Sequence, residues 1–286
     1  MYVVVQYKSR KKLVLTEREE MQMAKTVAFI NGKGGCGKST SIFHIAGVFA
    51  HRGQKTLVID LDKQKNTSKF LLIENEEEIE KTMFDFMTGS CEVEDVVKKA
   101  YFRKRGNATP KYYGVDVLPS DKRFEDETLL DVEKVNIKEK LEKFIKEQGY
   151  EWVIVDMPPS NKKINEICFS QIADNVIAPF SSDLYSVDGY ADLMEIVNEA
   201  RKVNEDLNIL GIYLSRYDAQ CGVDRFIKEQ LEEFDTFLDV QIPCMADLRE
   251  GIMFGRPMSF YKLVSKSRTA YEKLADVMET KIKKMK

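Results

Sequence analysis

The most constraining feature of the sequence is a glycine-rich stretch, residues 32–40, which reads Gly-Lys-Gly-Gly-Cys-Gly-Lys-Ser-Thr. Its first eight residues match the pattern G-x-x-x-x-G-K-[ST]. An apolar run over residues 26–31 leads into the stretch, and an amphipathic run over 38–52 leads out of it. A strand, a glycine-rich turn and a helix in this order form the first half of a β-α-β unit. The sequence therefore predicts a parallel sheet whose first crossover begins at this turn.

A turn of this composition is suited to phosphate groups. Glycines let successive backbone N–H groups point into one concavity, because no Cβ stands in the way. The following helix adds the positive end of its dipole. In this pattern the lysine, Lys38, contacts the β- and γ-phosphate oxygens and the hydroxyl of Ser39 ligates Mg²⁺. The residues predicted to bind the nucleotide are Gly34, Gly35, Cys36, Gly37, Lys38, Ser39 and Thr40.

Short apolar runs alternate with amphipathic stretches along the rest of the chain, as in a sheet with crossover helices. The predicted strands are residues 26–31, 55–60, 115–118, 152–156, 175–179, 208–215 and 238–242. The predicted helices are residues 38–52, 78–88, 134–147, 163–172, 187–203, 224–234 and 267–284. Most of the strands are nearly all apolar, which indicates cover on both faces. We predict an α/β fold of the P-loop NTPase type, with a mainly parallel twisted sheet and helices on both faces.

The 286 residues contain no internal repeat and no linker rich in Gly, Ser or Pro, so we predict one domain over residues 23–286. Residues 1–22 stand apart from it as an extension, and an extra hairpin, a partner-binding tail and an upstream start codon are all compatible with them. Residues 102–113 are polar and basic and contain Gly106 and Pro110. We expect them to form a surface excursion between a helix and a strand.

Composition excludes several classes of protein. Hydrophobic residues make up 43% of the chain, which is typical of a globular protein and not of a disordered one. The longest uncharged run has 13 residues, over 39–51, which is too short to cross a bilayer. The apolar start precedes its basic residues, the reverse of a signal peptide, so we expect a cytoplasmic protein. Five scattered cysteines without a CxxC indicate neither a disulfide framework nor a zinc site.

Two predicted strands end in aspartates, at Asp60 and Asp156. The carboxyl ends of parallel strands meet at one edge of a sheet, where ligands bind. The run Trp-Val-Ile-Val-Asp at 152–156 has the form of a Walker B strand, so Asp156 is predicted to hold Mg²⁺. The two histidines, His44 and His51, fall in one predicted helix, where packing or solvent exposure is favoured over metal ligation.

The glycine-rich stretch resembles the deviant Walker A motif, KGGxxK[ST], of the ParA/MinD class of P-loop ATPases. The matching residues are Lys33, Gly34, Gly35, Lys38 and Ser39. In that class the early lysine reaches across a dimer to the partner's nucleotide, so the resemblance implies a catalytic role for Lys33 as well as for Lys38. The D-x-P-P ending at residues 156–159 is similar to the ParA group in particular.

Residues 60–68 resemble the second motif of this class, D-x-D-P-Q-x-N-x-[ST]. The matching residues are Asp60, Asp62, Gln64, Asn66 and Ser68. The resemblance implies that Asp62 orients or activates the attacking water and that Asp60 lies near Mg²⁺. Lys63 stands where the family has proline, and Lys65 where it commonly has glycine. These departures put the rate of hydrolysis in question, so a switch that binds ATP without turnover stays open.

The likeness runs from about Met23 to the carboxyl end, with the motifs in family order. A ParA/Soj-type protein of this kind is implied to be a DNA partition ATPase that requires ATP and Mg²⁺. It would form an ATP-sandwich dimer, bind non-specific DNA in the cytoplasm at the nucleoid, and hydrolyse ATP weakly until a ParB-like centromere-binding partner stimulates it. We expect no stable membrane association.

Basic residues near the carboxyl end suggest the DNA contact. Residues 249–286 carry ten Lys or Arg and four Asp or Glu, whereas the whole chain has a net charge of −3. Phosphate neutralisation by such residues gives non-specific affinity for DNA. Gln220 and Asp247 occupy positions where chromosomal relatives carry arginine. The predicted DNA contacts are Arg225, Arg249, Lys262, Lys266 and Arg268.

Two alternatives lie in other classes. A MinD-like ATPase would place an amphipathic helix on a membrane surface, and residues 267–284 have apolar residues at 271, 274, 275, 278 and 282. The stripe is more simply explained as a core-packing face. A nitrogenase-like iron protein needs cysteines that bridge a cluster, and neither Cys91 nor Cys168 lies in a recognisable ligand context.

Overall fold

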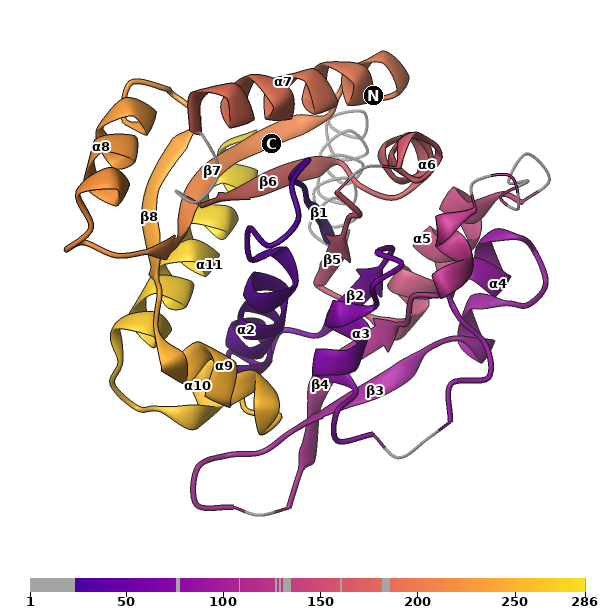
Figure 1. Ribbon diagram of the computed structural model, residues 1–286. Helices are drawn as coiled ribbons and strands as arrows, with labels where there is room; N and C mark the ends of the chain where they lie inside the picture. Colours follow the sequence, from indigo (N-terminus) through magenta and orange to yellow (C-terminus); the bar gives the residue numbers. More distant parts are fainter. Residues whose placement is uncertain are drawn as a thin grey trace, which may run out of the picture.

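The computed structural model describes residues 24–75, 78–107, 109–126, 128, 130, 135–159, 161–181 and 186–285. The predicted extension, residues 1–22, lies outside this part of the chain. An eight-stranded sheet in the order β3-β4-β2-β5-β1-β6-β7-β8 runs through the middle of the structure (Figure 1). All neighbouring strands pair parallel except β3, which pairs antiparallel with β4. The predicted mainly parallel α/β fold is therefore confirmed.

Each of the seven predicted strands is present, within a few residues of its predicted ends. The strands are β1 (Lys25–Phe29), β2 (Thr56–Asp60), β3 (Lys98–Phe102), β4 (Lys111–Leu118), β5 (Trp152–Asp156), β6 (Asn175–Phe180), β7 (Asn208–Tyr217) and β8 (Phe237–Pro243). The central strands β2 and β5 are buried along their whole length, as their apolar sequences require. The edge strand β3 was not predicted, since two of its five residues are lysines.

Helices cover both faces of the sheet, and the buried apolar residues form two core clusters. The longer ones are α2 (Lys38–His51), α5 (Ile137–Gln148), α6 (Lys162–Gln171), α7 (Ser186–Val203), α8 (Gly222–Leu231), α9 (Ala246–Met253) and α11 (Lys266–Met285). The short ones are α3 (Asn66–Leu71), α4 (Met83–Met87), α10 (Met258–Tyr261) and the 3-10 turns η1 (Val93–Asp95) and η2 (Lys122–Glu125). Residues of α2, α10 and α11 lie in one cluster, and residues of α4 to α8 lie in the other.

Two predictions about the middle of the chain are wrong. The helix predicted over 78–88 is reduced to α4, because Thr82 begins it with a capping box in which the Asp85 carboxylate accepts from the Thr82 backbone N–H. The basic segment 102–113 does not join a helix to a strand. It connects β3 to β4, and its Arg103 and Arg105 N–H groups donate to Gly255 O and Phe260 O.

The apolar stripe of α11 faces the core. The side chains of Tyr271, Leu274, Ala275, Met278 and Ile282 are buried, and the helix packs against α2 and β8. The interpretation of this stripe as a packing face is therefore confirmed. No helix among the described residues is both long enough and apolar enough to span a membrane.

His44 ties α2 to the helices that follow β8. Its ring is fully buried, its Nδ1 accepts from the Met258 N–H at 3.2 Å, and its Nε2 lies 3.3 Å from Leu248 O. A neutral imidazole with the proton on Nε2 satisfies both contacts, so His44 has the predicted packing role. Burial lowers the pKa of His44 to about 3.

This buried histidine predicts a loss of stability in mild acid. Between pH 6.5 and 3 the unfolded chain binds a proton at His44 and the folded chain does not, so the free energy of unfolding falls as the pH falls. From pH 7 to 5 the loss is about 2 kcal/mol. Urea unfolding at both pH values should show a much smaller loss for His44→Gln. The control is His51→Gln, at an exposed site, which should keep most of the wild-type pH dependence of the free energy of unfolding. Equal pH dependence in wild type and His44→Gln would contradict the role assigned to the buried, neutral His44.

Candidate nucleotide-binding site

The glycine-rich loop lies between the carboxyl end of β1 and the first turn of α2. Gly35 and Gly37 have φ angles of 80° and 92°, in the left-handed region that a Cβ disfavours. A Cβ added at Gly34 or Gly35 would meet no atom within 4 Å, so this stretch of backbone borders open space. Asn31, which sequence reasoning missed, braces the loop: its Oδ1 accepts from the Lys33 N–H at 2.9 Å and its Nδ2 donates to Pro179 O at 2.8 Å.

Lys38 is the buried cation of the loop. It is only 6% exposed, and its Nζ lies 3.4 Å from Asn31 O and 4.0 Å from the Cys36 Sγ. Within the described part of the chain no carboxylate forms an ion pair with this ammonium group. A buried ammonium is costly unless an anion is close to it. The loop therefore combines an open row of backbone N–H groups with a buried cation that forms no ion pair with the described residues.

The two strand-end aspartates lie side by side. Asp60 and Asp156 are opposite each other in the register of β2 and β5, and both are fully buried. The Oδ2 atom of Asp156 accepts from the Ser39 hydroxyl at 2.7 Å and from the Thr67 hydroxyl at 2.6 Å. Its Oδ1 atom is buried and takes no hydrogen bond from the residues that the structure describes. Thr67 was not predicted, since it occupies a variable position of the second motif.

Asp60 is fully engaged within the protein. Its Oδ2 accepts from both the backbone N–H and the hydroxyl of Ser68, at 2.8 and 2.6 Å, and its Oδ1 accepts from the Asp62 N–H at 3.0 Å. Asp60 thus fixes both ends of the turn that contains Asp62. Burial raises the pKa of Asp156, and burial together with the charge of Asp156 raises the pKa of Asp60. Two buried carboxylates of this kind favour a bound cation beside them.

Asp62 lies in the turn that follows β2 and is largely buried. It is 7% exposed, and its Oδ1 accepts from the Gln64 N–H at 2.9 Å. The ammonium group of Lys63 points to Glu125, whose Oε1 lies 2.8 Å away. Lys65 precedes α3 with a φ of 55°, a left-handed conformation that glycine adopts more easily. Lys63 and Lys65, the two residues that depart from the family motif, are therefore accommodated in the turn, with Lys65 in a strained conformation.

A cavity of about 400 Å³ opens beside the loop. Its walls come from the loop and α2, from the end of β7 and from the segment after β8. Pro243, Met245 and Leu248 give it an apolar side, and Arg216 and Arg249 contribute cations. Arg249, predicted as a DNA contact, thus lines a cavity next to the phosphate loop.

The predicted DNA-contacting residues come from three parts of the fold. Arg225 belongs to α8 and Arg249 to α9, whereas Lys262 follows α10 and Lys266 and Arg268 lie in the first turn of α11 (Figure 1). The Arg225 Nη1 donates to Ala219 O and Gln220 O. Lys262 lies 3.4 Å from the Asp247 carboxylate, and Arg268 lies 2.7 Å from Glu272. Three of the five cations thus have intramolecular partners.

Comparison with known sequences identifies relatives along nearly the whole chain. The model of the AAA domain family matches residues 24–209. The chain is 26% identical over 260 residues to the sporulation initiation inhibitor protein Soj of Bacillus subtilis, over 88% of this chain and 97% of Soj. It is 27% identical over 261 residues to the chromosome partitioning protein ParA of Caulobacter vibrioides, over 88% of this chain and 92% of ParA.

Solved structures show the same fold. A putative plasmid partition protein of Borrelia burgdorferi bound to AMPPNP superposes with a TM-score of 0.73 at 21% identity, over 90% of this chain and 99% of that one. A cobyrinic acid a,c-diamide synthase of Mycobacterium smegmatis with bound ADP and magnesium has a TM-score of 0.72 at 20% identity, over 91% and 96% of the two chains. One fold therefore serves proteins of different activity.

The strained Lys65 predicts a stabilising substitution. Lys65→Gly should raise the free energy of unfolding by about 0.5–1 kcal/mol, because the left-handed conformation costs a Cβ-bearing residue more than glycine loses in entropy. Lys65→Ala is the matched control, since it removes the same charge and keeps the Cβ. Urea unfolding at neutral pH compares the three chains. A gain in Lys65→Ala as large as in Lys65→Gly would attribute the effect to charge instead of backbone conformation.

Proposed function

The chain belongs to the AAA domain family of P-loop ATPases, and from this premise we propose that it is an ATP-dependent DNA partition ATPase. One observation carries the proposal. The buried ammonium of Lys38 forms no ion pair with a carboxylate of the described residues, and it shares the sheet edge with Asp156, whose buried Oδ1 takes no hydrogen bond from them. A nucleotide's phosphates and a divalent cation supply both missing partners.

The residues present fit Mg²⁺. The donor set is hard oxygen: the Ser39 hydroxyl and the Asp156 carboxylate, whose unpaired Oδ1 is a vacant acceptor, with Asp60 beside it. The ion, when bound, neutralises charge on the phosphate oxygens. Asp60 is committed to Ser68 and the Asp62 backbone, so its proposed part is to add negative charge and to shape the turn. Magnesium and ADP in the mycobacterial synthase are consistent with this reading.

The loop, Asp62 and the cavity have different parts in the proposed reaction. The backbone N–H groups of residues 34–40 hold the phosphates, with Lys38 on the terminal ones. Asp62, whose second carboxylate oxygen takes no hydrogen bond from the described residues, orients the attacking water. The base and ribose fit the cavity beside Pro243 and Met245. This division of labour, positioning plus electrostatics, is what phosphoryl transfer requires.

The remaining parts of the proposal concern partners. Lys33 lies on the partly exposed rim of the loop, from which its side chain can reach the nucleotide of a second copy in an ATP-sandwich dimer. The dimer binds non-specific DNA at the nucleoid, through cations such as Arg225, Arg249, Lys262, Lys266 and Arg268. A ParB-like centromere-binding partner stimulates a weak Mg²⁺-dependent hydrolysis. Support comes from the relatives named Soj and ParA, the latter a chromosome partitioning protein.

The domain organisation and the location of the protein are also proposals. Residues 23–286 act as one ATPase domain in the cytoplasm, and residues 1–22 extend it. A MinD-like placement of α11 on a membrane surface is disfavoured, because Tyr271, Leu274 and Met278 of its apolar stripe are buried in the core. Exposing that stripe would cost α2 and β8 their packing partner.

The nucleotide site is tested at its two lysines. Lys38→Ala should weaken ATP binding at least about a hundredfold, because it removes the buried cation of the phosphates. Lys33→Ala, the control in the same loop, should leave the ATP affinity of the isolated chain close to that of the wild type. Fluorescence anisotropy with a labelled ATP analogue measures both. Unchanged ATP affinity in Lys38→Ala would refute the loop assignment.

The partition function is tested on DNA of arbitrary sequence. Electrophoretic shift of duplex DNA should require ATP, and the affinity should fall about a thousandfold between roughly 50 and 200 mM salt if some six phosphates are neutralised. Lys38→Ala is the negative control. Asp62→Ala should stay on DNA longest with ATP, since it binds the nucleotide and does not turn it over. DNA binding that needs no nucleotide, or that resists salt, counts against the proposal.

A further inference from the structure

Residues 119–125 follow β4 in the chain and contact the turn that holds Asp62. Strand β4 runs beside β2, with Leu118 opposite Ile59, so the two chains leave the sheet at the same edge. The Ser120 hydroxyl donates to Asp62 O at 2.7 Å, and the Ser120 N–H donates to the Ser68 hydroxyl at 3.0 Å. Ser120 is itself buried. It therefore fixes the Asp62 turn at both of its ends.

The same segment makes two further contacts with the site. Lys63, directly after Asp62, pairs with Glu125. The Asn161 side chain donates to Phe124 O at 3.1 Å, and its Oδ1 caps α6, the helix that follows the β5 strand of Asp156. Residues 119–125 thus touch the segments that leave both aspartate-bearing strands.

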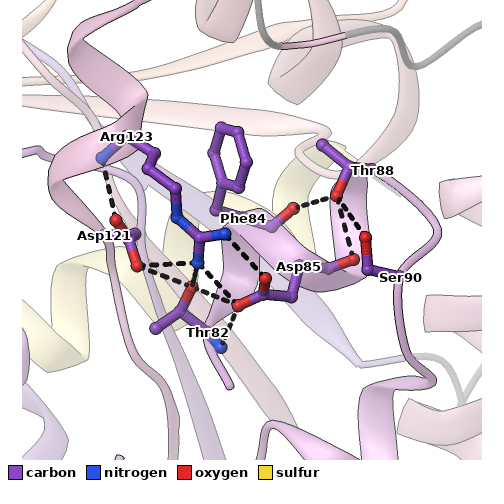
Figure 2. A network of polar contacts seen from close by, with 7 residues as sticks. All are labelled: Thr82, Phe84, Asp85, Thr88, Ser90, Asp121 and Arg123. Carbon is purple, nitrogen blue, oxygen red and sulfur yellow. Dashed lines mark hydrogen bonds and ion pairs between the residues drawn. The ribbon is translucent and has the colours of Figure 1, made fainter. Parts of the chain in front are cut away.

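One arginine holds this segment in place (Figure 2). The Arg123 Nη1 and Nη2 donate to the two oxygens of Asp85, both at 2.8 Å, and Nη2 also donates to Asp121 Oδ2 at 2.9 Å. The guanidinium lies 4.4 Å from the centre of the Phe84 ring. Arg123 is the point where the segment is bound to α4.

The two carboxylates belong to the starts of two helices. Asp85 accepts from the N–H and hydroxyl of Thr82 at the start of α4, and Asp121 accepts from the Arg123 N–H at the start of η2. The Met83 N–H also donates to Pro119 O at 2.8 Å. Arg123 holds the pKa of both carboxyl groups below their usual range, so both are ionised at neutral pH. A planar guanidinium suits this position, because it presents several N–H groups in a fixed geometry and can donate to both carboxylates at once.

We propose that Arg123 is a positioning residue for ATP hydrolysis, which clamps residues 119–125 to α4 so that Ser120 holds the Asp62 turn. The inference rests on the proposed function, in which Asp62 orients the attacking water. A misplacement of about 1 Å is enough to impair such orientation. Within the described part of the chain, the contacts of Arg123 are with Thr82, Phe84, Asp85 and Asp121 and not with the phosphate loop, so its effect is expected on turnover and not on nucleotide affinity.

Steady-state kinetics test the clamp. Arg123→Gln should lower kcat about tenfold and leave KM for ATP and the affinity for a labelled ATP analogue within about twofold. Arg123→Lys should recover part of kcat. The matched control is Arg103→Gln: Arg103 makes an equally close two-point pair with Glu74, at 2.6 Å for both contacts and similar exposure, and it lies at the end of β3. Its kcat should equal that of the wild type.

A double variant tests the route through Ser120. Ser120→Ala should lower kcat by a similar factor, and combining it with Arg123→Gln should lower kcat no further, because both act on the same turn. If the losses of kcat in the two single variants multiply in the double variant, the proposed action of Arg123 through Ser120 is wrong. A loss of kcat in Arg103→Gln as large as in Arg123→Gln would attribute the effect to general destabilisation and overturn the proposal as well.

Hydrogen exchange separates this inference from the function on which it rests. In the nucleotide-free protein, amides of residues 61–72 should exchange about tenfold faster in Arg123→Gln than in wild type, and at the wild-type rate in Arg103→Gln. Unchanged exchange in Arg123→Gln overturns the clamp whatever the kinetics. A wild-type chain without ATP turnover would instead overturn the proposed function, and the exchange rates would still show whether Arg123 holds the turn.

Discussion

The parallel register of β1, β5 and β2 is the constraint on which the rest of the site depends. Phe29, the last residue of β1, stands opposite Asp156, and Asp156 stands opposite Asp60. A loop and two carboxylates that are far apart in sequence thereby meet at one sheet edge. A shift of register by one residue would turn both aspartates to the other face of the sheet. Burial of β2 and β5 on both faces makes such a shift costly.

That edge is electrostatically incomplete without a ligand. Asp60 and Asp156 are buried next to each other, and the buried cation of the site, Lys38, is directed to backbone oxygen and sulfur. The hydroxyls of Ser39 and Thr67 compensate one oxygen of Asp156 and leave the other without a partner. Groups arranged in this way gain interaction energy when phosphates and a divalent cation arrive, so nucleotide binding and the stability of this edge are coupled.

The region around the Asp62 turn is organised by side chains that lie outside the nucleotide-binding motifs. Ser120, Arg123 and Asn161 connect the segments after β2, β4 and β5, and all of them act on backbone or on carboxylates of helix starts. Rigid support of this kind matters for the proposed function, because Asp62, the residue proposed to orient the attacking water, lies on a turn and not on a strand.

By itself, the sequence determined the glycine-rich loop, the seven parallel strands and the apolar stripe of α11, since these follow from local residue types and their periodicity. It also indicated Asp60 and Asp156, because each ends an apolar run that is typical of a strand, and it indicated Asp62 through the resemblance of residues 60–68 to the second motif of the ParA/MinD class. Tertiary structure alone decided that Thr67 binds Asp156, that Asn31 braces the loop, and that Arg249 faces the cavity beside it. These roles depend on which strands become neighbours. The contact of Arg123 with Asp85 escaped prediction for the same reason, because only folding brings the two residues together. The edge strand β3 escaped prediction because two of its five residues are lysines.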